Sequence, residues 1–402
     1  MEANRVWADI DLDALARNLR RIRARAGPVA IMLVLKADAY GHGAVAIAHR
    51  ALQSGVTAFG VGTSAEALEL RQCGIRAPIL VLGTILDAEA PACLRHGIHI
   101  ALHSSDRCQM LQQLARRLGR SAHVHLMIDT GMGSLGVPPG RAMALLDQIR
   151  LADHLQLAGV MTHMASPEGA LDPGTRMQIR RFQEVIESAR ERNLLGGRIH
   201  AANSACIFTD LRPLYDLVRP GLSAYGALPG ALSDPELEGV MSLRSQIVFL
   251  KDVPKGSPVG YGSTWKAEQP TRIATVSVGY NDGLPWRLGN RGEVLVHGRR
   301  APIAGSISMD YTCIDVGHLP GVRVGDRVTL FGRDGRHVLA LEEVARRAET
   351  IPYEITCAVG KRVERVVRGA APEPEIRELE ILPVSRPERR RASLSPAADA
   401  EA

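Results

Sequence analysis

Few aromatic residues and no long apolar run occur in this 402-residue sequence. Aromatic residues make up 4% of the chain, so we expect an aliphatic core and no stacking platform for single-stranded nucleic acid. The absence of a run of about 18 apolar residues argues against a membrane-spanning helix. The N-terminal residues also lack the apolar stretch of a secretory signal. These absences predict a cytoplasmic protein that does not act at a membrane.

Cysteine is scarce, and positive charge is only slightly in excess. The six cysteines are scattered and form no CxxC motif, so we expect reduced thiols and neither a disulfide nor a zinc site. No other set of side chains with metal-ligand spacing stands out. Lysine and arginine number 49 against 43 acidic residues, and the net charge of +6 is spread along the chain. Such a dispersed bias favours a small anionic ligand over nucleic acid.

The first part of the sequence alternates short apolar runs with amphipathic stretches, as in a chain of βα units. The amphipathic stretches before Gly55, Gly74 and Gly97 look like helices that end on a C′ glycine. The eight apolar runs are Ala30–Leu35, Ala58–Val61, Ile79–Leu82, His99–Leu102, Val124–Ile128, Leu157–Met161, Ile199–Ala202 and Leu217–Leu222. This pattern predicts an α/β fold, a (β/α)8 barrel of the TIM type over residues 1–240, with a doubly wound open sheet as the alternative.

From about residue 240 the apolar pattern changes to a period of two with turn residues between the runs, which is typical of strands. We therefore expect a mostly β domain over residues 241–385, interrupted by one helix at Leu341–Ala348. Residues 386–402 are rich in proline, serine, alanine and charge, which predicts a disordered tail. The expected strands are Gln246–Leu250, Ile273–Val278, Glu293–Val296, Ala301–Ile307 and Arg327–Phe331.

Lys36 is the most informative single residue. It follows the apolar run AIMLVL and precedes Ala37-Asp38-Ala39-Tyr40-Gly41-His42-Gly43. A lysine at the C-terminal end of a barrel strand faces the usual active-site side, and partial desolvation there would lower its pKa, as a nucleophilic lysine requires. A solvated lysine that caps a strand is the other interpretation.

A second group of residues suits a phosphate. Ser204 follows one late strand of the predicted barrel, and Arg219, Gly221 and Leu222 lie on the next. Loops after the last strands of such barrels often bind phosphate with backbone N–H groups and a hydroxyl. A buried Arg219 needs a fixed partner, so a structural ion pair is the alternative. His163 ends another strand, where it could pass on a hydrogen bond or be an ordinary core histidine.

Several motifs occur together in an order that resembles one enzyme family. They run from about Val6 to Arg365 and read WADIDLDALARN, KADAYGHG, DTGMG, THMA, HAANS, VRPG, VMSLRS, VGYG, GYNDG, SMD and IPYEI. The sequence thereby resembles the bacterial alanine racemases, which are fold-type III enzymes that use pyridoxal 5′-phosphate. The resemblance implies interconversion of L-alanine and D-alanine by two bases, with D-alanine as a peptidoglycan precursor. It also implies a head-to-tail homodimer with shared active sites.

The resemblance assigns roles to particular residues. Lys36 would bind the cofactor and handle the α-proton of the D-enantiomer, and Tyr261 would act on the L-enantiomer from the opposite face. A chain from Tyr261 through His163 to Arg219 would connect the second base to the cofactor ring. The phosphate would lie against Tyr40, Ser204, Gly221, Leu222 and Tyr353. The substrate would contact Met309 and Tyr280.

Some positions depart from the family pattern. Met127 stands where the family has a lysine that is often carbamylated, and Ser134 stands where an arginine contacts the substrate carboxylate. Ser306 and Trp286, the latter beside Arg287, replace arginines near the channel to the site, and Glu168 replaces an aspartate. These changes leave open a racemase for another small amino acid such as serine, or a non-catalytic cofactor-binding relative. A decarboxylase on the same plan lacks its expected motifs here.

Overall fold

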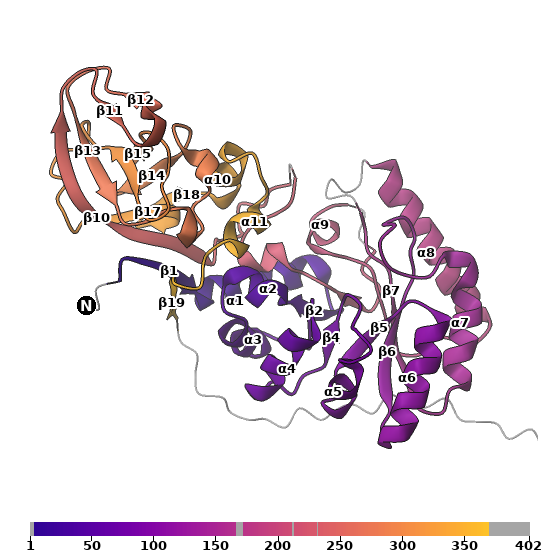
Figure 1. Cartoon of the computed structure of the whole chain (residues 1–402). Helices are drawn as coiled ribbons and strands as arrows, with labels where there is room; N and C mark the ends of the chain where they lie inside the picture. Colours follow the sequence, from indigo (N-terminus) through magenta and orange to yellow (C-terminus); the bar gives the residue numbers. More distant parts are fainter. Residues whose placement is uncertain (1–3, 166–171, 211–212, 231, 370–402) are drawn as a thin grey trace, which may run out of the picture. The chain divides into compact units, whose positions relative to one another are not determined.

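Eight parallel strands close into a barrel in the N-terminal part of the chain (Figure 1). The structure is a computed structural model that describes residues 4–165, 172–210, 213–230 and 232–369. Each barrel strand pairs with the next one along the chain, and the last pairs with the first. The strands are β2 (Ala30–Val34), β3 (Ala58–Val61), β4 (Ile79–Val81), β5 (His99–Leu102), β6 (Ala122–Met127), β7 (Leu155–Met161), β8 (Arg198–His200) and β9 (Leu217–Val218). The predicted (β/α)8 barrel is confirmed, and the open sheet is excluded.

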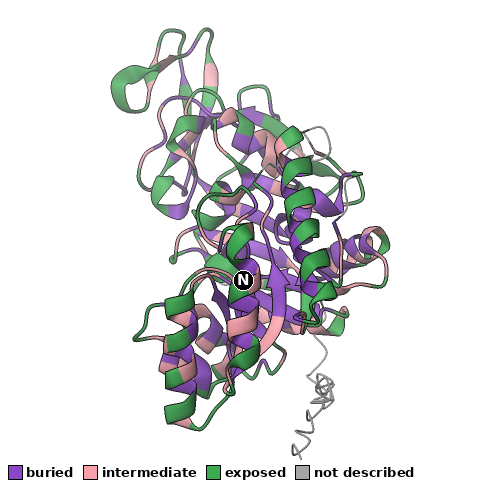
Figure 2. Cartoon of the chain, turned by 90° about the vertical axis from the view of Figure 1, so that its right-hand side faces the viewer, coloured by how far each residue is buried: buried purple, intermediate pink, exposed green. Residues whose placement is uncertain are grey.

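Amphipathic helices surround these strands and expose their polar faces, as the green outer surfaces in Figure 2 show. The buried side of α1, for example, carries Leu15, Leu19 and Ile22. Glycines 55, 74 and 97 all have a positive φ after a helix end, as predicted. The helices are α1 (Leu12–Ala26), α2 (Lys36–Gly41), α3 (Ala44–Gln53), α4 (Ser64–Gln72), α5 (Ala90–Arg95), α6 (Ser105–Leu118), α7 (Pro139–Leu151), α8 (Pro173–Glu191) and α9 (Ser204–Ile207). Within the described ranges, no helix is both long and apolar enough to cross a membrane.

The second part of the chain is mostly β, as predicted, and its main sheet also contains the first strand of the protein. The sheet runs in the order β15-β14-β17-β10-β1-β19, with β13, β16 and β18 attached. Its strands are β1 (Val6–Asp11), β10 (Met241–Val253), β13 (Thr271–Val276), β14 (Glu293–Val296), β15 (Arg299–Pro302), β16 (Thr312–Asp315), β17 (Arg327–Asp334), β18 (His337–Leu339) and β19 (Glu364–Arg368). Two short strands, β11 (Pro258–Val259) and β12 (Trp265–Lys266), pair separately.

Two details of this part differ from the sequence reading. β1 pairs with β10 and β19 and so lies in the second sheet, although it precedes the whole barrel in the sequence. The strand expected at Ala301–Ile307 ends at Pro302, because the chain then turns at Gly305, where φ is +85°. The predicted helix is present as α10 (Leu341–Arg347), and α11 (Pro352–Cys357) follows it. The predicted disordered tail lies outside the described residues.

The loop after β2 packs directly against α11. A Cβ atom at Gly41 would lie 2.2 Å from the carbonyl oxygen of Thr356, so only glycine allows this approach. Arg365, at the start of β19, donates a hydrogen bond from Nε to the Gly41 carbonyl at 3.1 Å. The same guanidinium donates to the carbonyl of Val359 at 2.7 Å. The barrel loop and the second part of the chain are therefore held together at one point.

Gly41→Ala should destabilise the protein far more than Gly55→Ala. The two glycines have similar φ angles, +81° and +83°, but nothing lies within 4 Å of a Cβ at Gly55. We expect Gly55→Ala to lower the free energy of unfolding by about 1 kcal/mol for the strained φ, and Gly41→Ala by about 3 kcal/mol because of the added clash. Urea unfolding of both variants measures the difference, and equal midpoints would contradict the packing described here.

Candidate active site

Lys36 lies at the carboxyl-terminal end of β2, where the buried run of that strand stops. Leu35 is fully buried, whereas Lys36, Ala37 and Asp38 are exposed. From its position on the strand we expected Lys36 to be partly desolvated. In a single chain Lys36 is exposed instead, because the exposed loop begins at this residue. Gly62 follows the neighbouring strand β3 and lies next to Lys36. A Cβ atom at Gly62 would lie 3.4 Å from the Lys36 Cβ.

The turn that follows Lys36 is left-handed over four consecutive residues that are not glycine. Ala37, Asp38, Ala39 and Tyr40 have φ angles of +53° to +55°. For L-residues this conformation costs roughly 1–2 kcal/mol each, so the surrounding structure must hold it in place. Strain of this kind is typical of functional sites, and here it lies directly beside the candidate nucleophile.

Two carboxylates outside the predicted site hold this turn. Glu66 accepts a hydrogen bond from the Ala37 backbone N–H at 2.7 Å and another from the Gly62 N–H at 2.7 Å. Asp38 accepts from the Ala44 N–H, the first residue of α3, at 2.6 Å. Neither residue was among the candidates from the sequence. The Thr63-Ser-Ala-Glu66 capping box at the start of α4 is the signal that could have identified Glu66.

Ser204, Gly221 and Tyr40 form a cradle suited to a phosphate. The Ser204 Oγ accepts hydrogen bonds from the Gly221 N–H at 2.9 Å, the Ser223 N–H at 3.2 Å and the Ser223 hydroxyl at 3.1 Å. A hydroxyl oxygen has two lone pairs, so these donors occupy its accepting positions and leave the Ser204 O–H to donate to an anion. The Tyr40 hydroxyl lies 2.5 Å from where a Cβ on Gly221 would be, next to Leu222. These sequence-predicted residues do lie together.

Arg219 follows β9 and is buried, with 4% of its surface exposed. Its Nη1 donates to Nδ1 of His200 at 2.7 Å, and its Nη2 donates to the Thr162 carbonyl at 2.7 Å. The ion pair considered from the sequence is absent from these contacts, which are with an imidazole and carbonyl oxygens. Burial lowers the pKa of Arg219 to about 10, so the guanidinium is still charged at neutral pH.

His163 lies between Arg219 and Lys36. Its Nδ1 is 3.4 Å from Nη2 of Arg219, and its carbonyl accepts from the Gln178 side chain at 2.9 Å. Burial first, and then the charges of Arg219 and Lys36, lower the pKa of His163 to about 4, so the imidazole is neutral. The structure thus brings three predicted residues from three different strands into one electrostatic neighbourhood.

The predicted residues of the second part divide into two groups. Tyr353, on α11, joins the barrel site, since its ring centroid lies 5.6 Å from that of Tyr40. Tyr280 and Met309 lie on adjacent loops, where the Asn281 N–H donates to the Met309 carbonyl at 3.2 Å. Tyr261 is 76% exposed. Among the described residues, no contact joins Tyr261, Tyr280 or Met309 to Lys36 within one chain.

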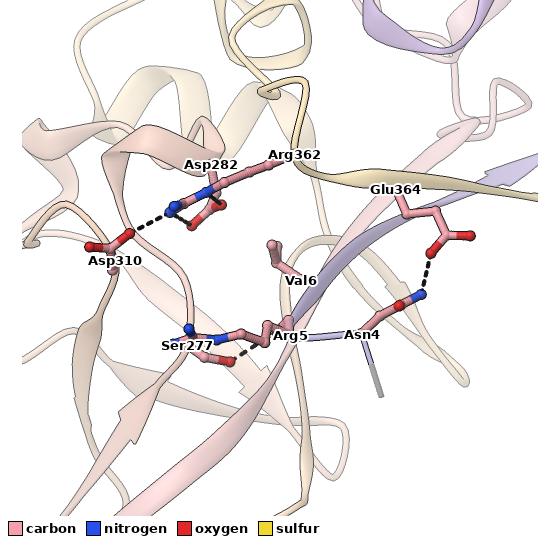
Figure 3. Close-up of a pocket in the computed structure, with 8 residues that line it drawn as sticks. All are labelled: Asn4, Arg5, Val6, Ser277, Asp282, Asp310, Arg362 and Glu364. Carbon is pink, nitrogen blue, oxygen red and sulfur yellow. Dashed lines mark hydrogen bonds and ion pairs between the residues drawn. The ribbon is translucent and has the colours of Figure 1, made fainter. Parts of the chain in front are cut away.

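Arg362, which the sequence analysis did not single out, fixes the loops that carry Tyr280 and Met309. Figure 3 shows its guanidinium between Asp282 and Asp310, at a cavity of about 280 Å³. It donates to the Asp282 carboxylate at 2.6 and 3.1 Å and to Asp310 at 2.7 Å. Asp282 belongs to the GYNDG motif and Asp310 to the SMD motif, so one arginine sets the position of both motifs.

The positions that depart from the family pattern lie in different surroundings. Met127 is 8% exposed and packs in an apolar layer of the barrel interior with Met32, Leu80 and Met161. Ser134 is exposed on the loop after β6. The hydroxyl of Ser306 donates to the Tyr261 carbonyl at 3.2 Å and so steadies that loop. Trp286 is 62% exposed, Arg287 pairs with Glu349 at 2.7 Å, and Glu168 lies outside the described residues.

Comparison with known proteins identifies relatives over nearly the whole chain. The family models for the N-terminal and C-terminal domains of alanine racemase match residues 10–229 and 240–367. The chain is 42% identical to an alanine racemase of Geobacter sulfurreducens over 376 residues, which is 91% of this chain and 98% of the relative. It is 38% identical to one of Symbiobacterium thermophilum over 90% of this chain and 97% of the relative.

Solved structures show the same likeness. The crystal structure of an alanine racemase from Streptomyces lavendulae, which produces D-cycloserine, is 34% identical, with a TM-score of 0.86 over 92% of this chain and 98% of that one. The enzyme from Bartonella henselae, solved with covalently bound pyridoxal phosphate, is 30% identical, with a TM-score of 0.82 over 90% of this chain and 99% of that one.

Arg362→Gln should destabilise the protein more than Arg272→Gln. Both arginines form two-bonded pairs with an aspartate and are similarly exposed, 46% for Arg362 and 47% for Arg272. The partners differ, because Asp282 is 2% exposed and Asp252 is 74% exposed. We expect a loss of about 2 kcal/mol for Arg362→Gln, which leaves a buried carboxylate without its cation, and little or no loss for Arg272→Gln, whose ion pair is exposed to solvent. Urea unfolding is the measurement, and similar losses would contradict the role given to Asp282.

Proposed function

Because the chain belongs to the alanine racemase family, we propose that Lys36 and Tyr261 are the two bases with which it interconverts L-alanine and D-alanine. The protein is an isomerase that racemises alanine, and its cofactor is pyridoxal 5′-phosphate. The assignment of the two bases rests mainly on one observation. Lys36 is exposed at the end of β2, and its charge and that of the buried Arg219 both act on His163.

The barrel site fits this cofactor. The cradle of Ser204, Gly221 and Tyr40 offers the hydroxyl groups of Ser204 and Tyr40 to a phosphate, beside the Gly221 backbone. Arg219 is a buried cation. Its contacts use only some of its guanidinium N–H groups, so others can donate to a ring nitrogen. Lys36 offers a primary amine at the end of a strand, where a carbonyl can reach it. When bound, pyridoxal phosphate supplies a carbonyl for the substrate amine and an electron-withdrawing ring that makes the Cα–H bond acidic.

The residues of the chain then move the proton. Lys36 Nζ takes the α-proton of D-alanine or returns one to that face, and Tyr261 Oη serves the opposite face for L-alanine. Arg219 is protonated at neutral pH and donates a hydrogen bond without giving up its proton. By leaving the ring nitrogen unprotonated, Arg219 would keep the electron withdrawal by the ring weak, which would favour return of the proton to Cα. Arg219 thereby favours racemisation over transamination.

Tyr353 and the Met309 loop set the substrate class in this proposal. The Tyr353 ring lies close to Tyr40 and narrows the pocket, which favours alanine over amino acids with long side chains. With Ser134 in place of an arginine, the backbone N–H of Met309 and the nearby Tyr280 bind the substrate carboxylate. Arg362, which holds the loop of Met309, is a positioning residue for this contact.

We also propose a head-to-tail homodimer in which Tyr261 of one chain completes the Lys36 site of the other. In support, Tyr261, Trp286, Met309 and Ile351 in the second part are between 53% and 76% exposed, and Tyr280 is 45% exposed. Large apolar side chains gathered on one part of a protein are typical of an interface. Such a dimer would bring Tyr261, the second base, to Lys36. Within the described part of one chain, no contact joins these two residues.

We further propose that the enzyme works in the cytoplasm. The support is its cysteine chemistry, since all six cysteines are free thiols in the structure. Thiols persist unpaired in a reducing compartment.

Deuterium exchange at Cα tests the two bases separately. The cofactor-loaded wild type, incubated with L-alanine in D₂O, should yield deuterated D-alanine, read by NMR together with chiral chromatography. Tyr261→Phe should slow exchange from L-alanine by about a hundredfold or more, because the phenolic base is lost. The same variant should still exchange D-alanine, whose α-proton faces Lys36. Tyr311→Phe, another exposed tyrosine of the second part, is the control and should behave as wild type.

Two outcomes would overturn this assignment. Undiminished exchange from L-alanine by Tyr261→Phe would remove Tyr261 as the second base. No exchange by wild type on either enantiomer would move the substrate to another small amino acid, or leave a cofactor-binding role.

Mixing two inactive variants tests the shared sites. In Lys36→Ala every site lacks one base, and in Tyr261→Phe every site lacks the other. Mixed dimers with the proposed arrangement contain one intact site, so random pairing restores about a quarter of wild-type activity. The measurement is racemase activity after the two variants are unfolded together and refolded. No recovery, with dimers confirmed by sedimentation, would show that each chain carries a complete site.

A further inference from the structure

Two buried histidines and the half-buried His99 form a hydrogen-bonded chain that leads away from Arg219 through the inside of the barrel. Arg219 Nη1 contacts Nδ1 of His200, on β8, at 2.7 Å. His200 Nε2 contacts Nδ1 of His125, on β6, at 2.9 Å, and His125 Nε2 contacts Nδ1 of His99, the first residue of β5, at 3.0 Å. His123 stacks on His99 with ring centroids 4.8 Å apart. The racemisation steps described above use none of these histidines.

The direction of every hydrogen bond in this chain follows from Arg219. A guanidinium only donates, so Nδ1 of His200 must accept and carries no proton. A neutral His200 then has its proton on Nε2 and donates it to Nδ1 of His125. The same argument places a proton on Nε2 of His125, which donates to Nδ1 of His99. Burial lowers the pKa of His125 to about 3 and that of His200 well below its usual value, so both rings are neutral.

The barrel makes room for this chain at one place. β7 lies between β6 and β8, and the residue of β7 paired with His125 is Gly159. A Cβ on Gly159 would lie 2.5 Å from Nδ1 of His125, the atom that accepts from His200. The pairing of β6 with β7 shifts its register between Val124 and His125. A register shift and a glycine at the same point are typical of a local strand irregularity that changes the direction of a side chain.

We propose that His125 and His99 are positioning residues for racemisation, which hold the His200 ring in the orientation in which its Nδ1 accepts from Arg219. Without an acceptor at His125, the Nε2–H of His200 is buried without a partner. The ring then turns toward another acceptor, and the hydrogen bond from Arg219 Nη1 to its Nδ1 weakens. The guanidinium shifts away from the position in which it serves the cofactor ring. This role rests on the proposed function of Arg219.

The test compares two substitutions at His125 in the cofactor-loaded enzyme. Asn places its amide oxygen near the position of Nδ1 and keeps an acceptor for His200, whereas Leu removes it. The first readout is the ¹⁵N shift of His200 Nδ1 in histidine-labelled protein, which reports the hydrogen bond from Arg219. Wild type and His125→Asn are expected to show the same hydrogen-bonded shift, and His125→Leu a shift toward that of an acceptor nitrogen without a donor.

The second readout concerns the reaction. His125→Leu should change the absorption spectrum of the bound cofactor and lower kcat about tenfold with KM for alanine unchanged within about twofold. His125→Asn should keep kcat within about threefold of wild type. His123→Phe keeps the stacked ring beside His99 without entering the chain, and it is the matched control that should leave spectrum and kinetics as in wild type.

The outcomes separate this inference from the proposed function. A wild-type Nδ1 shift, spectrum and kcat in His125→Leu would overturn the inference, and so would equal losses in the Asn and Leu variants. If the wild type does not racemise alanine, the proposed function fails, and the ¹⁵N and absorption readouts still decide whether His125 positions Arg219. Folding of each variant is checked by its urea midpoint. Gly159→Ala displaces the His125 ring independently, and the same change in the Nδ1 shift of His200 is expected.

Discussion

A buried guanidinium balanced by neutral acceptors is the constraint on which the barrel site depends. Arg219 is held by carbonyl oxygens and an imidazole, which satisfy its donors without cancelling its charge. A carboxylate in their place would neutralise the charge that Arg219 is proposed to turn toward the cofactor ring. Burial first, and then the positive charge of Arg219, lower the pKa values of His163 and His200. The cation thus adds to burial in keeping its neighbouring imidazoles neutral.

The strained turn after Lys36 explains why the two parts of the chain act as a unit. Four left-handed residues are unstable alone, and their neighbours in the barrel supply only some of the stabilising contacts. The rest comes from the second part, where Arg365 and the close approach of Gly41 to Thr356 fix the end of the turn. The position of Lys36 therefore depends on a contact between the parts, in addition to any contribution of a partner subunit.

The barrel was predictable from the sequence because its signals are local. Apolar runs, amphipathic stretches and C′ glycines such as Gly55 each reflect a few neighbouring residues. The place of β1 was not predictable, because its partners β10 and β19 lie far along the chain and pairing leaves no local pattern. Motifs singled out Lys36 and Arg219, which the structure places after β2 and β9, and their roles stay predictions. Glu66 was missed because its role is to hold another segment's backbone, which depends on folded geometry.

The surroundings of Met127 match its apolar side chain. Met127 belongs to an apolar layer of the barrel interior, in which a lone lysine or its carbamate would be a buried charge without compensation. Ser134, by contrast, is exposed on the loop after β6. In the second part, Arg362 holds the loop of Met309 in place, and its guanidinium donates to Asp282 and Asp310. A substrate carboxylate in the proposed site would therefore bind to groups that Arg362 positions, such as the Met309 N–H, and not to the guanidinium itself.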